Sequence, residues 1–325
     1  MAERRGIDAP YSSHGLAHNT QFHQGEDSAA AKNVPTMAKM IKKTMILTQR
    51  LFDSTYPSLS VPCVKGTLAN VFTDTHCHLT HAPTGARAAI MQAQVDGVST
   101  MITVGTDLAS SAECVQIAAS NPGVFAVVGI HPNDAIEATE AVLGRIADLS
   151  THPRVVGVGE TGLDYFRQGA PPVRQEESFR SHIRIARDND RTLVIHDREA
   201  HDDIVRILTD EMPLPRVVFH CFSGDADLVA TCAEHGWYMS FAGNVTFTNA
   251  TGLQQAAAKV PLDLLLTETD SPYLTPHPHR GKPNAPSFVT VTTAFLAELF
   301  DTDAAGMAAQ VTTNAKQAFA LPDDG

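Results

Sequence analysis

A chain of 325 residues that is 43% hydrophobic and 18% charged has the composition of a globular protein with a sizeable core, which excludes disordered and fibrous classes. Its apolar runs are far shorter than the roughly 20 residues that a membrane-crossing helix needs. The formal net charge of −12 argues against an extended nucleic-acid groove, because proteins usually neutralise phosphates with Lys and Arg. Metal ions and a few basic side chains can still attract a strand end or a short substrate locally.

Cysteine usage and the first residues bear on the cellular compartment. The five cysteines form no CxxC pair, which argues against a disulfide framework. The chain starts with Met-Ala-Glu-Arg-Arg and continues into polar sequence, so we expect no secretory signal. These features predict a cytoplasmic protein without membrane association, and no obligate protein partner is evident from the sequence.

Residues 1–70 differ from the rest of the chain. They carry eight Lys/Arg and five Asp/Glu, a net charge of +3, which leaves −15 for the remainder. Residues 11–36 are polar and lack periodicity, which predicts disorder. Residues 37–52 fit a short basic amphipathic helix, or else a flexible tail with Met37, Met40 and Met45 as alternative start sites. We therefore expect a flexible extension over 1–70 and a single barrel domain over 71–325.

From residue 71 onward, short apolar runs alternate with stretches of helical periodicity. Strands are predicted near 71–75, 99–104, 124–129, 154–159, 192–196, 216–220, 237–241 and 263–267, and helical patterns include 113–119, 142–149, 178–187 and 201–208. Continuous apolar runs are typical of parallel strands that are covered on both faces. Eight such units over about 250 residues predict an α/β fold, a (β/α)8 TIM-type barrel. Residues 286–319 are expected to form two helices that close the ring.

The first strand ends in Asp74-Thr-His76-Cys77-His78. Alternate residues of a strand share a face, so His76 and His78 point to one side and form half of a metal site. Asp74 is expected to bond a ligand histidine or cap local backbone. Cys77 faces the other way and is expected to pack.

Further candidates follow later strands. Glu160 ends the fourth strand, where a carboxylate needs cations and could bridge two ions; a salt bridge in the barrel mouth, with Arg167 the nearest basic residue, is the alternative. Asp164 and Tyr165 beyond it fit loop stabilisation and substrate contact equally well. His131 ends the third strand and is predicted to contact substrate or to make a structural hydrogen bond.

The fifth and sixth strands end in His196 and His220. Arg198, two residues after His196, suits phosphate binding, and a salt bridge with Glu199 or Asp202 is as good an interpretation. After His220, the pair Ser223-Gly224 fits either an anion site at the next helix N-terminus or a plain turn.

Asp270, after the eighth strand, is predicted to bind metal, orient the attacking water and accept its proton, with Glu268 supporting the network. Together the candidates satisfy a two-metal hydrolytic site, in which a water shared between the ions becomes hydroxide near neutral pH. His76, His78 and Asp270 would hold one ion, His196 and His220 the other, and Glu160 would bridge. The donor set suits Zn, Mn or Co, and Mg less well.

The motifs at 74–79, 159–165, 195–200, 220–224 and 268–274 resemble, in that order, those of the TatD family of metal-dependent deoxyribonucleases, a branch of the amidohydrolase-like barrels. The loop 280–284 is similar as well, and it adds Arg280 to His131 and Arg198 as expected substrate-binding residues. Thr161 departs from the aliphatic residue common in the family. The resemblance implies two divalent metals on the six candidates above and hydrolysis of DNA phosphodiester bonds from 3′ ends, with single strands or 3′ ends as the partner.

Two other functions compete with this interpretation. The same metal-activated water could attack a small ester or amide, such as an aminoacyl ester on tRNA. A metal-binding scaffold without catalysis, recruited through a basic tail, is the non-enzymatic alternative. Removing Asp270 separates the last case, because a scaffold would keep its role without that carboxylate.

Overall fold

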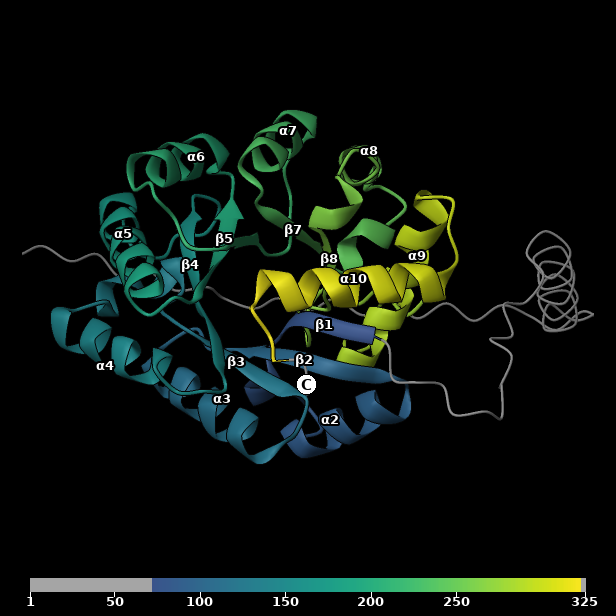
Figure 1. Ribbon diagram of the computed structural model, residues 1–325, viewed down its shortest axis with the longest axis horizontal. Helices are drawn as coiled ribbons and strands as arrows, with labels where there is room; N and C mark the ends of the chain where they lie inside the picture. Colours follow the sequence, from purple (N-terminus) through teal and green to yellow (C-terminus); the bar gives the residue numbers. More distant parts are fainter. Residues whose placement is uncertain (1–71, 323–325) are drawn as a thin grey trace, which may run out of the picture. The chain divides into compact units, whose positions relative to one another are not determined.

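The computed structural model describes residues 72–322, and the predictions made for residues 1–70 lie outside this range. Figure 1 shows strands surrounded by helices, with the chain running around the ring. The strands are β1 (Phe72–Cys77), β2 (Val98–Val104), β3 (Val124–Val128), β4 (Val155–Asp164), β5 (Thr192–Arg198), β6 (Val217–Phe219), β7 (Tyr238–Phe241) and β8 (Leu265–Thr267). All eight predicted strands are therefore present.

The eight strands form one parallel sheet in the order β1 to β8, each paired with its neighbours in the chain. A parallel bridge between Cys77 and Ser271 joins the last strand region back to the first, so the barrel is nearly closed. The strands are buried along almost their whole length, as their continuous apolar sequences require. The predicted (β/α)8 TIM-type barrel is confirmed.

Nine α-helices lie between and after the strands within residues 72–322. They are α2 (Ala86–Val95), α3 (Leu108–Ser120), α4 (Glu140–Ser150), α5 (Pro172–Asp188), α6 (His201–Asp210), α7 (Ala226–His235), α8 (Thr251–Ala257), α9 (Val289–Leu299) and α10 (Ala304–Ala318). Short 3-10 turns are η1 (Leu79–His81), η2 (Pro132–Glu137), η3 (Gly243–Thr246), η4 (Leu262–Leu264) and η5 (Pro286–Phe288). None of these helices is both long and apolar enough to span a membrane.

Some boundaries differ from the sequence predictions for a physical reason. β4 runs to Asp164, well past the apolar run, because Thr161 to Asp164 pair with Ile195 to Arg198 of β5. Thr161, Gly162 and Asp164 interrupt the apolar pattern in the sequence, whereas backbone pairing extends the strand. β8 is shorter than predicted, since Pro261 starts a 3-10 turn over Leu262–Leu264.

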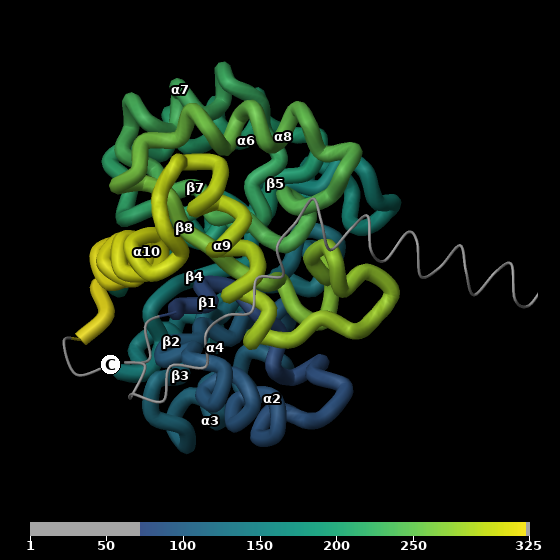
Figure 2. Tube along the Cα trace, turned by 90° about the vertical axis from the view of Figure 1, so that its right-hand side faces the viewer, coloured from purple at the N-terminus to yellow at the C-terminus, as the bar shows by residue number. Residues whose placement is uncertain are grey.

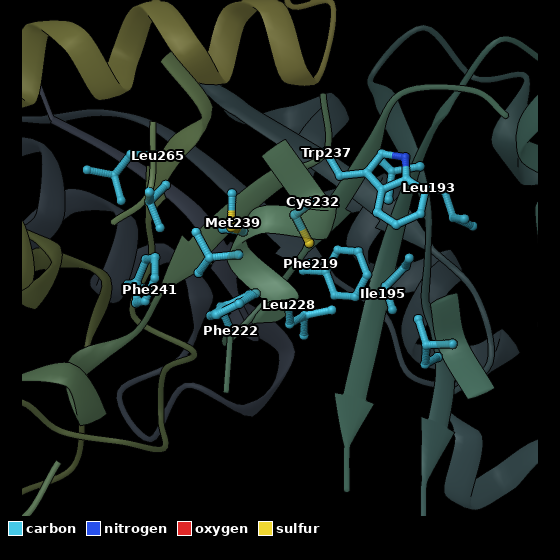
Figure 3. Packing of buried hydrophobic residues seen from close by; sticks show 14 of the residues in the cluster. Leu193, Ile195, Phe219, Phe222, Leu228, Cys232, Trp237, Met239, Phe241 and Leu265 are labelled. Carbon is cyan, nitrogen blue, oxygen red and sulfur yellow. The ribbon is translucent and has the colours of Figure 1, made fainter. Parts of the chain in front are cut away.

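Two layers of apolar side chains hold the barrel. One lies between the strands and the outer helices and includes Phe219, Met239 and Phe241 (Figure 3). The other fills the barrel interior with side chains such as Ile102 and Phe125 and reaches Phe319 at the end of α10. Figure 2 shows α10 and α9 beside the β1 and β8 region. The two C-terminal helices therefore close the ring as predicted, with α10 at the amino-terminal end of the barrel.

Candidate metal centre

The six predicted ligands come together at the carboxyl ends of the strands. Five of them line a cavity of about 720 Å³, namely His78, Glu160, His196, His220 and Asp270. His76 is fully buried behind this lining, with its Nε2 3.2 Å from Glu160 Oε2. Residues spread over almost 200 positions thus meet at one end of the barrel, because parallel strands all end there.

Local backbone geometry aims two of these side chains. Asp270 follows β8 with a left-handed backbone, φ 52°, which turns its carboxylate into the mouth. Gly162 in β4 has φ 137°, and a Cβ there would lie 2.2 Å from the carbonyl oxygen of His196. Only glycine lets β4 approach the His196 backbone so closely.

A first group of donors consists of His76, His78 and Asp270. Asp270 Oδ1 lies 3.3 Å from His78 Nε2 and 3.9 Å from His76 Nε2. The Nδ1 of His78 is 3.0 Å from the Val104 carbonyl oxygen, which can only accept. The ring therefore carries its proton on Nδ1 and presents a lone pair on Nε2, as a metal-ligating histidine does.

A second group consists of Glu160, His196 and His220. His220 Nε2 lies 2.9 Å from Glu160 Oε2 and 3.3 Å from His196 Nδ1. Glu268 Oε1 lies 3.3 Å from His220 Nδ1 and accepts the Cys221 N–H at 2.8 Å. Glu268 thus fixes the orientation of the His220 ring, with its Nε2 toward Glu160, in line with the supporting role expected for Glu268.

Several buried donor and acceptor atoms of these groups have no hydrogen-bond partner among residues 72–322. They are His76 Nδ1 and Nε2, Glu160 Oε2, His196 Nε2 and Glu268 Oε2. Their neighbours are close, but the N–H and O directions do not align as hydrogen bonds. Buried polar atoms are costly when unpaired, and imidazole nitrogens with carboxylate oxygens are what divalent cations bind. The residues therefore fit a metal centre.

Burial and charge act against each other at this centre. Burial raises the pKa of Glu160, but His220 and His76 more than offset it and hold that pKa well below its usual range. Burial lowers the pKa of His220, whereas Glu160 and Glu268 raise it well above its usual value. Glu160 is consequently an ionised carboxylate in a water-poor environment, which favours cations beside it.

Two further side chains adjoin the second group. Asp164 Oδ2 is 3.3 Å from His196 Nε2, while its Oδ1 accepts the backbone N–H groups of Phe166 and Arg167. Asp164 therefore stabilises the loop after β4, as one prediction had it, and its other oxygen lies beside the candidate site. His131 lines the cavity with Nε2 3.5 Å from Glu160 Oε1, and burial lowers its pKa to about 4. The sequence predictions did not include Asp164 among the ligands.

Supporting residues resolve several open alternatives. Asp74 accepts hydrogen bonds from the backbone N–H of His76 and from the N–H and hydroxyl of Thr269, so it holds backbone and not a ligand ring. Cys77 is buried in the core. The α7 N-terminus is capped by Asp225, whose carboxylate accepts two of its N–H groups, and the Ser223 hydroxyl donates to the Asp197 carbonyl beside the cavity.

The predicted substrate-binding arginines have different surroundings. Arg198 lines the cavity with its guanidinium carbon 4.0 Å from the Phe166 ring centroid, and within residues 72–322 it makes no ion pair, so the salt bridge with Glu199 or Asp202 is not formed. Arg280 stacks 3.9 Å from the Phe247 ring centroid and is not among the lining residues. Arg167 also lines the cavity, a placement that its position in the sequence did not reveal.

Comparisons with known proteins agree with this site. The family model described as TatD related DNase matches residues 73–320. An uncharacterized metal-dependent hydrolase, TatD, of Mycobacterium tuberculosis is 39% identical over 259 residues, 76% of this chain and 97% of that protein. YabD of Bacillus subtilis, described in the same words, is 38% identical over 251 residues, 76% of this chain and 98% of that protein.

A solved structure shows the same relationship. The crystal structure of YjjV, a TatD homologue from Escherichia coli, superimposes with a TM-score of 0.74 at 28% identity, covering 78% of this chain and all of that one. The family match covers most of the chain and includes every candidate ligand. The chain therefore belongs to the TatD family of metal-dependent hydrolases.

Proposed function

We propose that this protein is a metal-dependent deoxyribonuclease that hydrolyses phosphodiester bonds at DNA 3′ ends or in short single strands. The family description, TatD related DNase, supports the substrate class. The observation that carries the proposal is the set of unpartnered buried nitrogen and carboxylate oxygen atoms at one end of the barrel, facing a cavity that also holds an unpaired arginine.

We assign the ligands in two groups that share one carboxylate. His76, His78 and Asp270 would hold one ion, His196 and His220 would hold the other, and Glu160 would serve both, which its position between His76 and His220 supports. Zn, Mn and Co fit the mixed donors best, and Mg remains a candidate. When bound, two divalent cations activate water and neutralise charge on a phosphoryl group.

The chain's own side chains supply the remaining functions. Asp270 lines the cavity with a largely buried side chain, 14% exposed, so it can orient the attacking water and accept its proton. Arg198, with its guanidinium carbon over the Phe166 ring, offers a planar guanidinium to a phosphate. Phe166 and Tyr273 are 57% and 52% exposed, and the latter lines the cavity, so both can stack on unpaired bases.

A strand end suits this cavity better than continuous duplex. The chain is acidic overall, which disfavours a long phosphate-binding track, and Arg167 and Arg198 line the mouth. Cytoplasmic location is part of the same proposal; the four cysteines within residues 72–322 are all free, which fits a reducing compartment.

The test compares substrates and metals on one preparation. The purified protein is stripped with a chelator, reloaded with Zn, Mn, Co or Mg, and given a 3′-labelled single strand, a blunt duplex and an aminoacyl ester. We expect metal-dependent release of 3′ nucleotides, fastest from the single strand. Faster turnover of the ester by a large factor would replace the nuclease assignment with esterase activity.

A matched variant pair excludes contaminating nucleases. Asp270→Ala, purified identically, is expected to lose about 10³-fold in turnover because the proton acceptor is gone. Asp188→Ala removes an exposed carboxylate at the end of α5 and should retain full activity. Equal activity of Asp270→Ala and wild type would show that the chain itself does not catalyse the reaction.

A further inference from the structure

His131 stands at the end of β3 with its two ring nitrogens in different environments. It caps the 3-10 turn η2, and its Nδ1 accepts the backbone N–H of Asn133 at 3.0 Å. An N–H group only donates, so Nδ1 must carry a lone pair. A neutral imidazole has a single N–H, which the cap therefore places on Nε2.

The same capping contact occurs a second time in the chain. His152 Nδ1 accepts the backbone N–H of Arg154 at 3.1 Å. In both places proline follows the histidine and lacks an N–H, so the next free N–H is the one two residues on. The His-Pro sequence thus fixes the tautomer locally, whatever lies at the other nitrogen.

At His131 the other nitrogen lies at the metal centre. Nε2 is 3.5 Å from Glu160 Oε1, longer than an ordinary hydrogen bond, and it has no hydrogen-bond acceptor within residues 72–322. The ring centroid is 4.5 Å from that of His196, and the side chain is 12% exposed to the cavity. Geometrically His131 groups with Asp164 and His196 as a possible third cation site. An Nε2 that carries hydrogen has no lone pair for a cation, which removes His131 from the ligands.

We propose that His131 is a neutral hydrogen-bond donor to an anionic oxygen of the substrate, with its Nε2–H held toward the cavity by the Asn133 cap. The proton stays on Nε2 throughout, so no transfer step is involved. A donor that is oriented before substrate binds stabilises charge developing on a phosphoryl oxygen without reorganising. The identity of that oxygen rests on the proposed function, whereas the tautomer does not.

Two substitutions separate the two nitrogens. His131→Asn keeps an acceptor at the Nδ1 position, so the cap survives and the Nε2–H is lost. His131→Gln reaches the Nε2 position with an amide N–H and loses the cap. We expect kcat to fall about 10²-fold in His131→Asn with an unchanged metal content per chain. His131→Gln should recover part of that loss at a lower melting temperature.

His152→Asn is the matched control, since it makes the same change in the same turn away from the site. It should leave kcat unchanged. A kcat of His131→Asn equal to wild type would reduce His131 to a cap. Loss of bound metal from His131→Asn, with turnover per bound metal unchanged, would make it a ligand or a support for Glu160, and either result overturns the proposal.

A readout independent of turnover is the ¹⁵N spectrum of the imidazoles in zinc-loaded protein, with His131→Asn identifying the signal. We expect a protonated Nε2 and an unprotonated Nδ1, and inorganic phosphate should shift the Nε2–H resonance. The opposite tautomer, or no response to saturating phosphate, would sink the inference. If no phosphodiester is hydrolysed but this signature is found, the proposed function fails while the donor assignment stands.

Discussion

At the amino-terminal end of the barrel, several buried polar side chains are paired within the protein. The Thr73 and Thr312 hydroxyls lie 3.0 Å apart, and the Thr192 hydroxyl donates to the Ala318 carbonyl at 2.7 Å. The Asn314 amide donates to the carbonyls of Leu262 and Leu265, both at 2.8 Å. These bonds attach α10 to the strands that it covers.

At the carboxyl end, equally buried groups lack such partners. Both nitrogens of His76, Glu160 Oε2 and His196 Nε2 have no hydrogen-bond partner within residues 72–322. Each unpaired buried group costs about 1–3 kcal/mol, so a stable fold keeps several together only where a ligand completes them. The clustering of unpaired nitrogen and carboxylate oxygen atoms distinguishes the carboxyl end, which holds the candidate site, from the amino-terminal end.

The largest effect is expected for Glu160, the carboxylate that we assign to both ions at the carboxyl end of the barrel. Glu160→Gln removes the charge and replaces one acceptor oxygen with a donor, so turnover should fall about 10³-fold or more, accompanied by loss of bound metal. Metal analysis and kinetics on the same sample check both. Glu113→Gln, on the exposed face of α3, is the control and should behave as wild type. Full metal content in Glu160→Gln would contradict the assignment.

A histidine whose ring nitrogens are both hydrogen-bonded within the protein should affect the stability of the fold and not turnover. His182 is fully buried; its Nε2 accepts the Ile130 N–H, its Nδ1 donates to the Ser178 carbonyl, and burial lowers its pKa to about 4. The unfolded chain takes up this proton near pH 6.5, so stability is intact above that pH and is lost as pH falls toward 4. The loss should reach roughly 3 kcal/mol.

Denaturant unfolding at pH 7 and pH 4.5 measures this contribution in the metal-free protein. His182→Gln should show a weaker pH dependence over that interval than wild type. The exposed His277→Gln controls for loss of a histidine and should retain the wild-type dependence. An unchanged slope in His182→Gln would mean that this buried histidine does not set the acid limit.

The amino-terminal end of the barrel can be destabilised without changing the candidate metal centre. Asn314→Ala leaves two carbonyls without their side-chain donor and should lower the free energy of unfolding by about 2 kcal/mol. Turnover at 25 °C should be unchanged, because Asn314 is in α10 at the opposite end of the barrel. Thr313→Ala, the exposed neighbour in the same helix, should cost almost nothing. A drop in kcat for Asn314→Ala would contradict this prediction, because it would show that the two ends of the barrel are coupled.

The smallest effect is expected for Arg198, which lines the cavity at the carboxyl end of the barrel. Arg198→Ala removes one charged hydrogen bond to substrate and should raise KM about tenfold with little change in kcat. Arg198→Lys keeps the charge but not the planar fork or the Phe166 stack, so an intermediate value is expected. Arg145→Ala, an exposed charge lost on α4, is the control. An unchanged KM in Arg198→Ala would remove this residue from substrate binding.

The strand ends are predictable because an apolar run followed by polar residues is a local signal in the sequence. His76, Glu160 and His220 each follow such a run, and the parallel order of strands then brings them together. The motif alone predicts Arg280 as a substrate-binding residue, yet its guanidinium lies over Phe247 and outside the cavity lining. Asp164 was ambiguous, because its contact with His196 depends on β4 extending beside β5.

The sequence by itself determined the barrel, the order of its strands and which side chains sit at their carboxyl ends, because periodicity, chain length and strand polarity are written into consecutive residues. Only the tertiary structure decided which buried atoms remain unpartnered, which arginines line the cavity, and which groups lie beside the Nε2 of His131. Those properties depend on distances and directions between segments far apart in the chain, and short-range patterns carry no such information.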